Sequence, residues 1–183
     1  MMIILNSFSI GTSVSYSIAA VVMYSDTKSH IATPLNANEL SWVVSIMKIS
    51  FMCFILSSGF FNEFLGRKKT LLIGQFIIIK GWFLVYFTKS YELLVGARFL
   101  MGIGVGICYP TTYLYLSEIA LVKYRGSVSI LNTVTVNIAF VYMVVLVLFT
   151  NFDLLILMAS LPGLIFLLAW AALPESPLWL LKR

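Results

Sequence analysis

Three consecutive cations, Arg67, Lys68 and Lys69, separate two long apolar runs, and this arrangement constrains the fold more than any other feature. The run before them covers residues 42–61 and the run after them residues 71–87. Adjacent cations are costly inside hydrocarbon, whereas about 20 apolar residues have the length that crosses a bilayer. We therefore expect the chain to turn at a membrane surface here, with one helix on each side.

Composition supports a membrane protein along the whole chain. Hydrophobic residues make up 61% of the 183 residues and charged residues 10%, against about 45–50% and about 25% in soluble domains. Cys53 and Cys108 fall inside apolar runs and the one histidine, His30, lies in a polar connector, so neither disulfides nor a metal site is expected. The net charge of +5 is spread over separate clusters, which argues against nucleic acid as a partner. We expect no cofactor.

The apolar runs predict an all-α membrane protein with six transmembrane helices. The expected spans are residues 3–23, 40–61, 70–87, 93–116, 127–150 and 154–173. Only helices and closed barrels satisfy every backbone group in lipid, and these runs are too long and too uniformly apolar for barrel strands.

Lysine and arginine on the connectors predict the orientation of the spans. One set of connectors and the C-terminal tail carry seven cations, namely Arg67, Lys68, Lys69, Lys123, Arg125, Lys182 and Arg183. The opposite connectors carry Lys28 and Lys89. Because cytoplasmic connectors hold the excess of Lys and Arg, we expect both termini in the cytoplasm.

Acidic residues stand at the expected cytoplasmic helix ends, beside the cationic connectors. Glu63, Glu118 and Glu175 are placed to form an ion-pair network with Arg67 and Arg125. Ion pairs that form when helices close and break when they separate act as a gate. For the segment around Arg67 the simpler interpretation, a topology anchor, stays open.

The fourth span carries a cation, Arg98, among the glycines Gly96, Gly102, Gly104 and Gly106. No strand precedes these glycines and no Lys-Ser/Thr pair follows them, so they indicate close helix packing rather than a phosphate loop. A guanidinium inside a membrane needs a partner or a water-filled cavity. Snorkelling to the surface is the alternative for Arg98.

Uncharged polar side chains inside the spans are candidates for substrate binding. Thr133 and Asn137 are four residues apart in the fifth span, and Thr12 and Tyr16 in the first, so each pair shares a helix face. Hydroxyls and amides without charge suit a neutral polyol. Hydrogen bonding between helices is the alternative role.

Four motifs in order resemble the sugar porter family of the major facilitator superfamily. They are Gly-Arg-Lys-Lys at 66–69, Ala-Arg-Phe-Leu-x-Gly-x-Gly-x-Gly at 97–106, Glu-x6-Arg-Gly at 118–126 and Pro-Glu-Ser-Pro at 174–177. Gly-Thr-Ser at 11–13 and Ser-Trp at 41–42 are similar to its facilitated trehalose transporter-like branch.

The resemblance implies one half of a twelve-helix carrier, built as a 3+3 inverted repeat. Residues 1–173 match the N-terminal half, and residues 174–183 match the start of the cytoplasmic linker. Gly66 and Gly126 then belong to the cytoplasmic gate network together with the five charged residues named above. The implied activity is not enzymatic but facilitated transport of a neutral sugar, trehalose or a hexose, by alternating access across the plasma membrane. The implied partners are the sugar, the lipid bilayer and either a C-terminal half or a second copy.

The chain also departs from the family pattern at several positions. Thr133 stands where a sugar-binding glutamine is usual, and Tyr113 where a proline is usual. Ser17 stands near an acidic position used for proton coupling in some members, which favours facilitated transport. Lys48 and Lys80, inside spans, are atypical. The alternative function is a non-transporting membrane protein that pairs with or regulates a full-length carrier.

Overall fold

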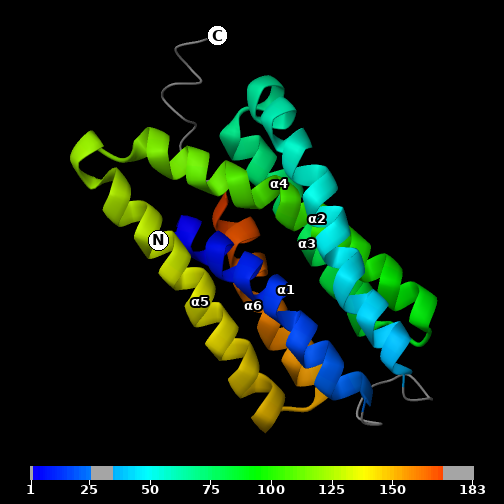
Figure 1. Cartoon of the computed structure of the whole chain (residues 1–183). Helices are drawn as coiled ribbons and strands as arrows, with labels where there is room; N and C mark the ends of the chain where they lie inside the picture. Colours follow the sequence, from blue (N-terminus) through cyan, green and yellow to red (C-terminus); the bar gives the residue numbers. More distant parts are fainter. Residues whose placement is uncertain (1, 26–34, 171–183) are drawn as a thin grey trace.

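A computed structural model describes residues 2–25 and 35–170, and this part of the chain is helical (Figure 1). Its elements are α1 (Met2–Ser25), α2 (Ala37–Leu65), α3 (Arg67–Tyr86), α4 (Tyr91–Ile119), the 3-10 turn η1 (Val122–Tyr124), α5 (Arg125–Phe149) and α6 (Phe152–Ala169). All six α-helices are long and apolar enough to cross a membrane. The predicted six-span, all-α fold is therefore confirmed.

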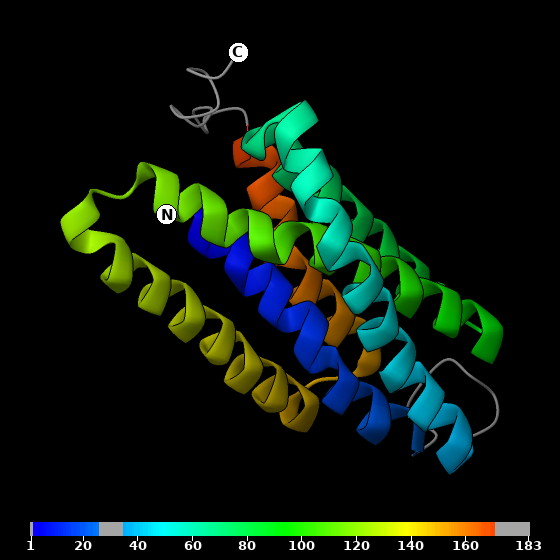
Figure 2. The ribbon, with the colours of Figure 1, turned by 45° about the horizontal axis from the view of Figure 1, so that its top comes forward.

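The helices run up and down, so that the start of α1, the α2–α3 turn and the α4–α5 connector lie at one end of the bundle (Figure 1). The helix α4 packs against α2 and α3, while α1 packs against α5 and α6. The first helix of each three-helix unit thus packs on the second and third helices of the other unit. As a consequence, α1 lies between α2 and α5 on one face of the bundle (Figure 2).

The helices α2 and α4 extend three or more residues past the expected span ends, where polar residues have partners inside the bundle. The helix α2 continues beyond residue 61, since Asn62 Nδ2 donates to Thr111 Oγ1 at 3.0 Å. It ends at Gly66, whose φ of 82° is the left-handed conformation that glycine adopts without strain. Helix α4 continues through Glu118, and the short turn η1 was not expected from the sequence.

The glycines of α4 let α2 and α3 approach its backbone from two sides. A Cβ on Gly102 would lie 2.5 Å from the Met47 carbonyl oxygen of α2. A Cβ on Gly104 would lie 2.7 Å from the Gly74 carbonyl oxygen of α3. The expected packing role is confirmed for these glycines and for Gly106. It is wrong for Gly96, where a Cβ would meet nothing within 4 Å, because that residue faces away from both helices.

Gly102→Ala is expected to destabilise the bundle by about 1–3 kcal/mol, the usual cost of overpacking a close contact. The contact is with backbone of α2, which cannot swing aside as a flexible side chain would. Thermal unfolding in detergent measures the change. Gly96→Ala is the matched control on the same helix, and equal losses for the two variants would contradict the packing assignment.

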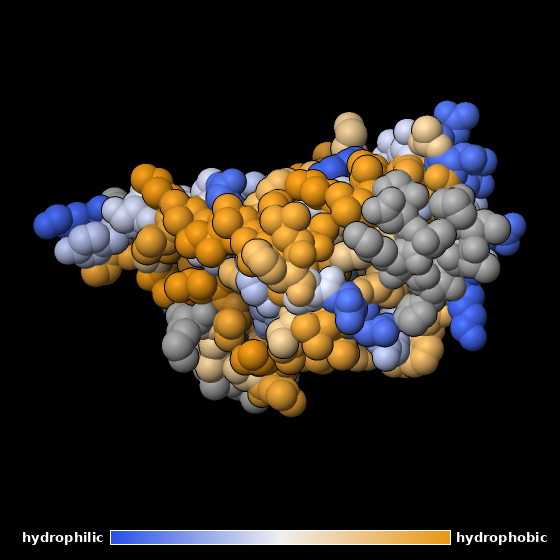
Figure 3. Space-filling view, turned by 90° about the horizontal axis from the view of Figure 1, so that it is seen from below, coloured by the Kyte–Doolittle hydropathy of each residue, from blue (hydrophilic) through white to orange (hydrophobic). Residues whose placement is uncertain are grey.

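The outer surface is apolar, as expected for contact with hydrocarbon. Figure 3 shows a face covered mostly by hydrophobic residues, with hydrophilic residues gathered mainly towards the two ends. Leu56, Phe149 and Leu168 are each more than four-fifths exposed. In water such a surface would be unfavourable, so the bilayer is the environment that fits it.

Candidate functional site

An ion pair joins two helices at the end of the bundle that holds the α2–α3 turn. Arg67, the first residue of α3, directs Nη2 and Nε at Glu118 Oε1 of α4, at 2.6 and 3.1 Å. Its Nη1 donates to the Asn62 carbonyl oxygen at 3.3 Å. The two charged side chains are only 11% and 7% exposed. A pair so shielded from water is stronger than a surface ion pair.

The other predicted gate residues that the structure describes lie on the ends of α2 and α5 and in the turn before α3. Arg125 begins α5 and is exposed, and its side chain bonds to no described residue. Glu63 is exposed on the last turn of α2, and Gly66 makes the left-handed turn that places Arg67. A Cβ on Gly126 would meet nothing within 4 Å. Glu175 lies outside the described residues.

Arg98 is fully buried in the half of the bundle away from the α2–α3 turn, where it links three helices. Its guanidinium donates to the carbonyl oxygens of Ser13 (3.2 Å) and Val43 (3.4 Å) and to Ser17 Oγ (2.6 Å). Its Cζ lies 5.2 Å from the centre of the Tyr16 ring. The guanidinium is thus held by neutral acceptors and an aromatic face, and it does not snorkel to the surface.

A ladder of uncharged polar groups lies on the exposed face of α5 and the adjoining part of α4. The Tyr113 hydroxyl is 3.0 Å from Thr133 Oγ1, and Asn137 Nδ2 donates to the Thr133 carbonyl oxygen at 2.9 Å. The rings of Tyr109 and Tyr113 lie 5.2 Å apart. Asn137 also lines an open hollow of about 500 Å³. Both predicted residues of α5 are therefore open to a ligand.

The other predicted binding residues, Thr12 and Tyr16, lie elsewhere. Both are fully buried, and Thr12 Oγ1 donates to carbonyl oxygens of Ser9 and Ala159. The Tyr16 hydroxyl pairs with that of Tyr24 at 3.1 Å. The structure does not bring Thr12 and Tyr16 together with the α5 pair. Thr12 links α1 to α6 by a hydrogen bond, which was the alternative role, whereas the Tyr16 hydroxyl bonds within α1.

Sequence reasoning missed Tyr109 and Tyr113 as site residues, although the signal was present. They are four residues apart on α4, the same spacing that singled out Thr133 and Asn137. It also left open the place of Lys48, which lines a cavity of about 250 Å³ between α1, α2, α4 and α5.

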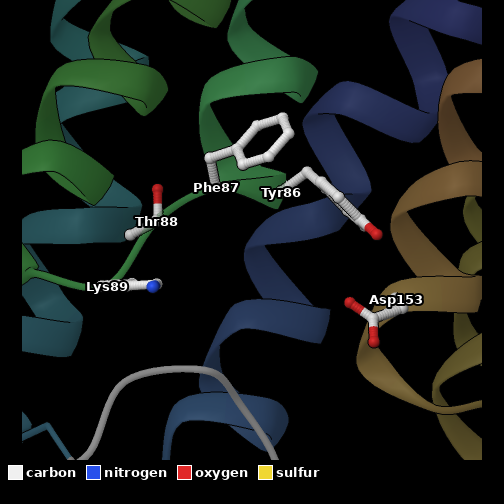
Figure 4. A pocket seen from close by; sticks show the side chains of 5 residues that line it. All are labelled: Tyr86, Phe87, Thr88, Lys89 and Asp153. Atoms are coloured by element: carbon white, nitrogen blue, oxygen red, sulfur yellow. The ribbon is translucent and has the colours of Figure 1, made fainter.

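A separate pocket of about 200 Å³ lies at the opposite end of the bundle, near the α3–α4 turn. It is lined by Tyr86, Phe87, Thr88, Lys89 and Asp153 (Figure 4). Lys89 and Asp153 reach towards each other across it (Figure 4). None of the predicted site residues contributes to this pocket.

The bundle of six membrane-length helices, with exchanged packing between its three-helix units, defines a half of the major facilitator fold. It superimposes on the xylose transporter XylE from E. coli in an inward-open conformation, with a TM-score of 0.83 at 19% identity. The match covers 98% of this chain and 48% of that one. A peptide transporter, POT, also matches, with a TM-score of 0.78 at 15% identity. The fold is therefore shared by carriers of different substrates.

The family described as "Sugar (and other) transporter" matches residues 1–183, and the chain belongs to this family. "Sugar transporter ERD6-like 6" of Arabidopsis thaliana is 33% identical over 81% of the chain. "Facilitated trehalose transporter Tret1" of Polypedilum vanderplanki is 28% identical over 98% of the chain. The "Arabinose-proton symporter" of Escherichia coli K12 is 32% identical over 81%. These matches cover 30%, 35% and 32% of the relatives, so the chain spans about a third of their length.

Proposed function

We propose that the chain supplies one wall of a carrier for a neutral sugar, trehalose or a hexose, and that it works with a second six-helix half. The observation that carries the proposal is the ladder of Tyr113, Thr133 and Asn137. It presents hydroxyl and amide groups without charge on an exposed face of a sugar transporter half. Such groups hydrogen-bond sugar hydroxyls while leaving the surroundings neutral.

The surroundings of Arg98 support facilitated transport over proton coupling. Coupling to protons needs a group that gains and loses a proton near the transport path. The side chain nearest to the Arg98 guanidinium is Ser17, whose hydroxyl stays neutral at physiological pH. Among the described residues, no carboxylate forms an ion pair with Arg98.

Alternating access requires two halves that rock about a site between them. The Arg67–Glu118 pair fixes α3 to α4 at one end of this half. Arg125 at the start of α5, whose exposed side chain bonds to no described residue, is open to an acid of the second half. Under the proposal these charges form the cytoplasmic gate. Both termini then lie in the cytoplasm, and the carrier works in the plasma membrane.

The ladder is tested by Asn137→Leu in a carrier completed with the C-terminal half of another family member. We expect the KM for labelled trehalose or glucose to rise about tenfold, because one hydrogen bond of about 1.4 kcal/mol is lost. Thr135→Val is the matched control on the same helix, since Thr135 is buried and its hydroxyl bonds only the Leu131 carbonyl oxygen.

Equal KM values for Asn137→Leu, Thr135→Val and the unchanged carrier would contradict this site. If the chain bound the added half but the completed carrier showed no saturable sugar uptake, a non-transporting partner role would be favoured instead.

A further inference from the structure

Lys48 places a positive charge deep within the membrane-spanning part of the chain. It lies eleven residues into α2, about 16 Å from the start of that helix. Its side chain is exposed and lines the cavity of about 250 Å³ between α1, α2, α4 and α5. The rest of the lining is apolar or aromatic, and includes Ile10, Val105 and Tyr109. The cavity is thus an apolar recess with one cation.

Among the described residues, nothing offers this ammonium group a counter-charge. Lys48 forms no hydrogen bond and no ion pair with any described residue. The described acids all stand in the first or last turn of their helices, at Glu39, Glu63, Glu92, Glu118 and Asp153. Glu39, on the same helix, is about 14 Å away along the axis. The nearby charge that acts on Lys48 is a second cation, Arg98, which repels it.

An unneutralised ammonium at this depth is unfavourable, and intramembrane charges are almost always paired or facing water. Because the described residues provide no counter-charge, a group of a second polypeptide is the candidate for it. The described part of a second copy does not provide it, because the acids there also lie at helix ends and its own Lys48 would add repulsion. A sugar is a poor match for the recess, since its many hydroxyls would face mostly apolar side chains.

We infer that the recess around Lys48 receives a membrane helix of the second half, and that this helix carries a single carboxylate on an otherwise apolar face. The inference rests on the proposed function, which requires a second half. The apolar lining accepts aliphatic side chains, and the ammonium accepts the acid. The pair makes the interface selective for a complementary half over a second copy of this chain.

The test uses the full 183-residue chain and, as a separate polypeptide, the C-terminal six-helix half of a family member. Single glutamates are placed in turn at mid-membrane positions of the added half. Energy transfer between fluorophores on the two halves measures their association in vesicles. We expect glutamates on one helix face to tighten association at least tenfold. This gain should disappear with Lys48→Met. It should persist with the control Lys80→Met, because the Lys80 ammonium of the unchanged chain lies over the Phe76 ring on α3.

The charge-reversed pair, Lys48→Glu with lysine at the best position, should recover the gain. The inference is overturned if no glutamate tightens association, or if the gain survives Lys48→Met. It is also overturned if the chain associates with itself and Lys48→Met abolishes that association. Binding of a free fatty acid, dodecanoate, in the recess while no glutamate tightens association would overturn it as well. Trehalose uptake by the same vesicles separates the two proposals. Uptake without a glutamate gain refutes only the inference, and a gain without uptake refutes only the sugar-carrier function.

Discussion

Arg98→Ala is expected to lower the free energy of unfolding by about 3 kcal/mol, in the range for truncating a large buried side chain. Arg98 is completely buried and bonds to Ser13 and Ser17 of α1 and to Val43 of α2. Truncation removes these links and leaves a void beside the Tyr16 ring. Thermal or denaturant unfolding in detergent micelles measures the loss.

The matched control is Lys80→Ala, which removes a cation in the middle of α3. Lys80 is exposed, and its ammonium lies 4.8 Å over the Phe76 ring, so its removal should change stability by less than about 1 kcal/mol. If the two variants are equally stable, Arg98 does not hold the three helices together.

The second large effect is expected at the Arg67–Glu118 pair. Glu118→Gln should lower transport by a completed carrier about 10- to 100-fold, because a charge-assisted hydrogen bond contributes about 1.5–3 kcal/mol. The pair is shielded from water, so solvation of the remaining Arg67 does not offset the free energy lost with the Glu118 carboxylate. Initial uptake rates, corrected for the amount of carrier in the vesicles, give the measurement.

Exchanging the charges of Arg67 and Glu118 distinguishes a direct pairing of the two side chains in the gate from a need for each charge separately. Arg67→Glu combined with Glu118→Arg should regain part of the activity that each single change removes, since the two side chains contact each other directly. Lys69→Met, on an exposed residue in the first turn of α3, is the control and should transport normally. Additive losses in the double variant would contradict a direct functional pairing.

The sequence predicted the spans well because hydrocarbon thickness sets their length. It placed the span ends less well, since they depend on tertiary partners. Asn62 stays helical through its bond to Thr111, and α4 runs on through Glu118, which pairs with Arg67. The sequence placed Arg67 in a charge network with Glu118, but it did not identify Thr111 as the partner of Asn62.

The site was predictable in its chemistry but only partly in its geometry. A spacing of four residues shows which side chains share a helix face, but not whether that face is buried. Thr133 and Asn137 face outward, whereas Thr12 and Tyr16, chosen by the same rule, face the interior. The rule that a membrane arginine needs partners was sound for Arg98. The identity of these partners, which are backbone carbonyls and a hydroxyl, depends on the packing of α1 and α2 on α4 and is visible only in the structure.

The central claim is that these 183 residues form one wall of a sugar path and need a second half to complete it. Labelled trehalose and glucose uptake into reconstituted vesicles tests this claim, with the chain alone and with the chain joined to the C-terminal half of a related carrier. The account predicts saturable uptake, inhibited by unlabelled sugar, only for the joined protein. Saturable, competitor-sensitive uptake by a demonstrated monomer of the chain alone would contradict it.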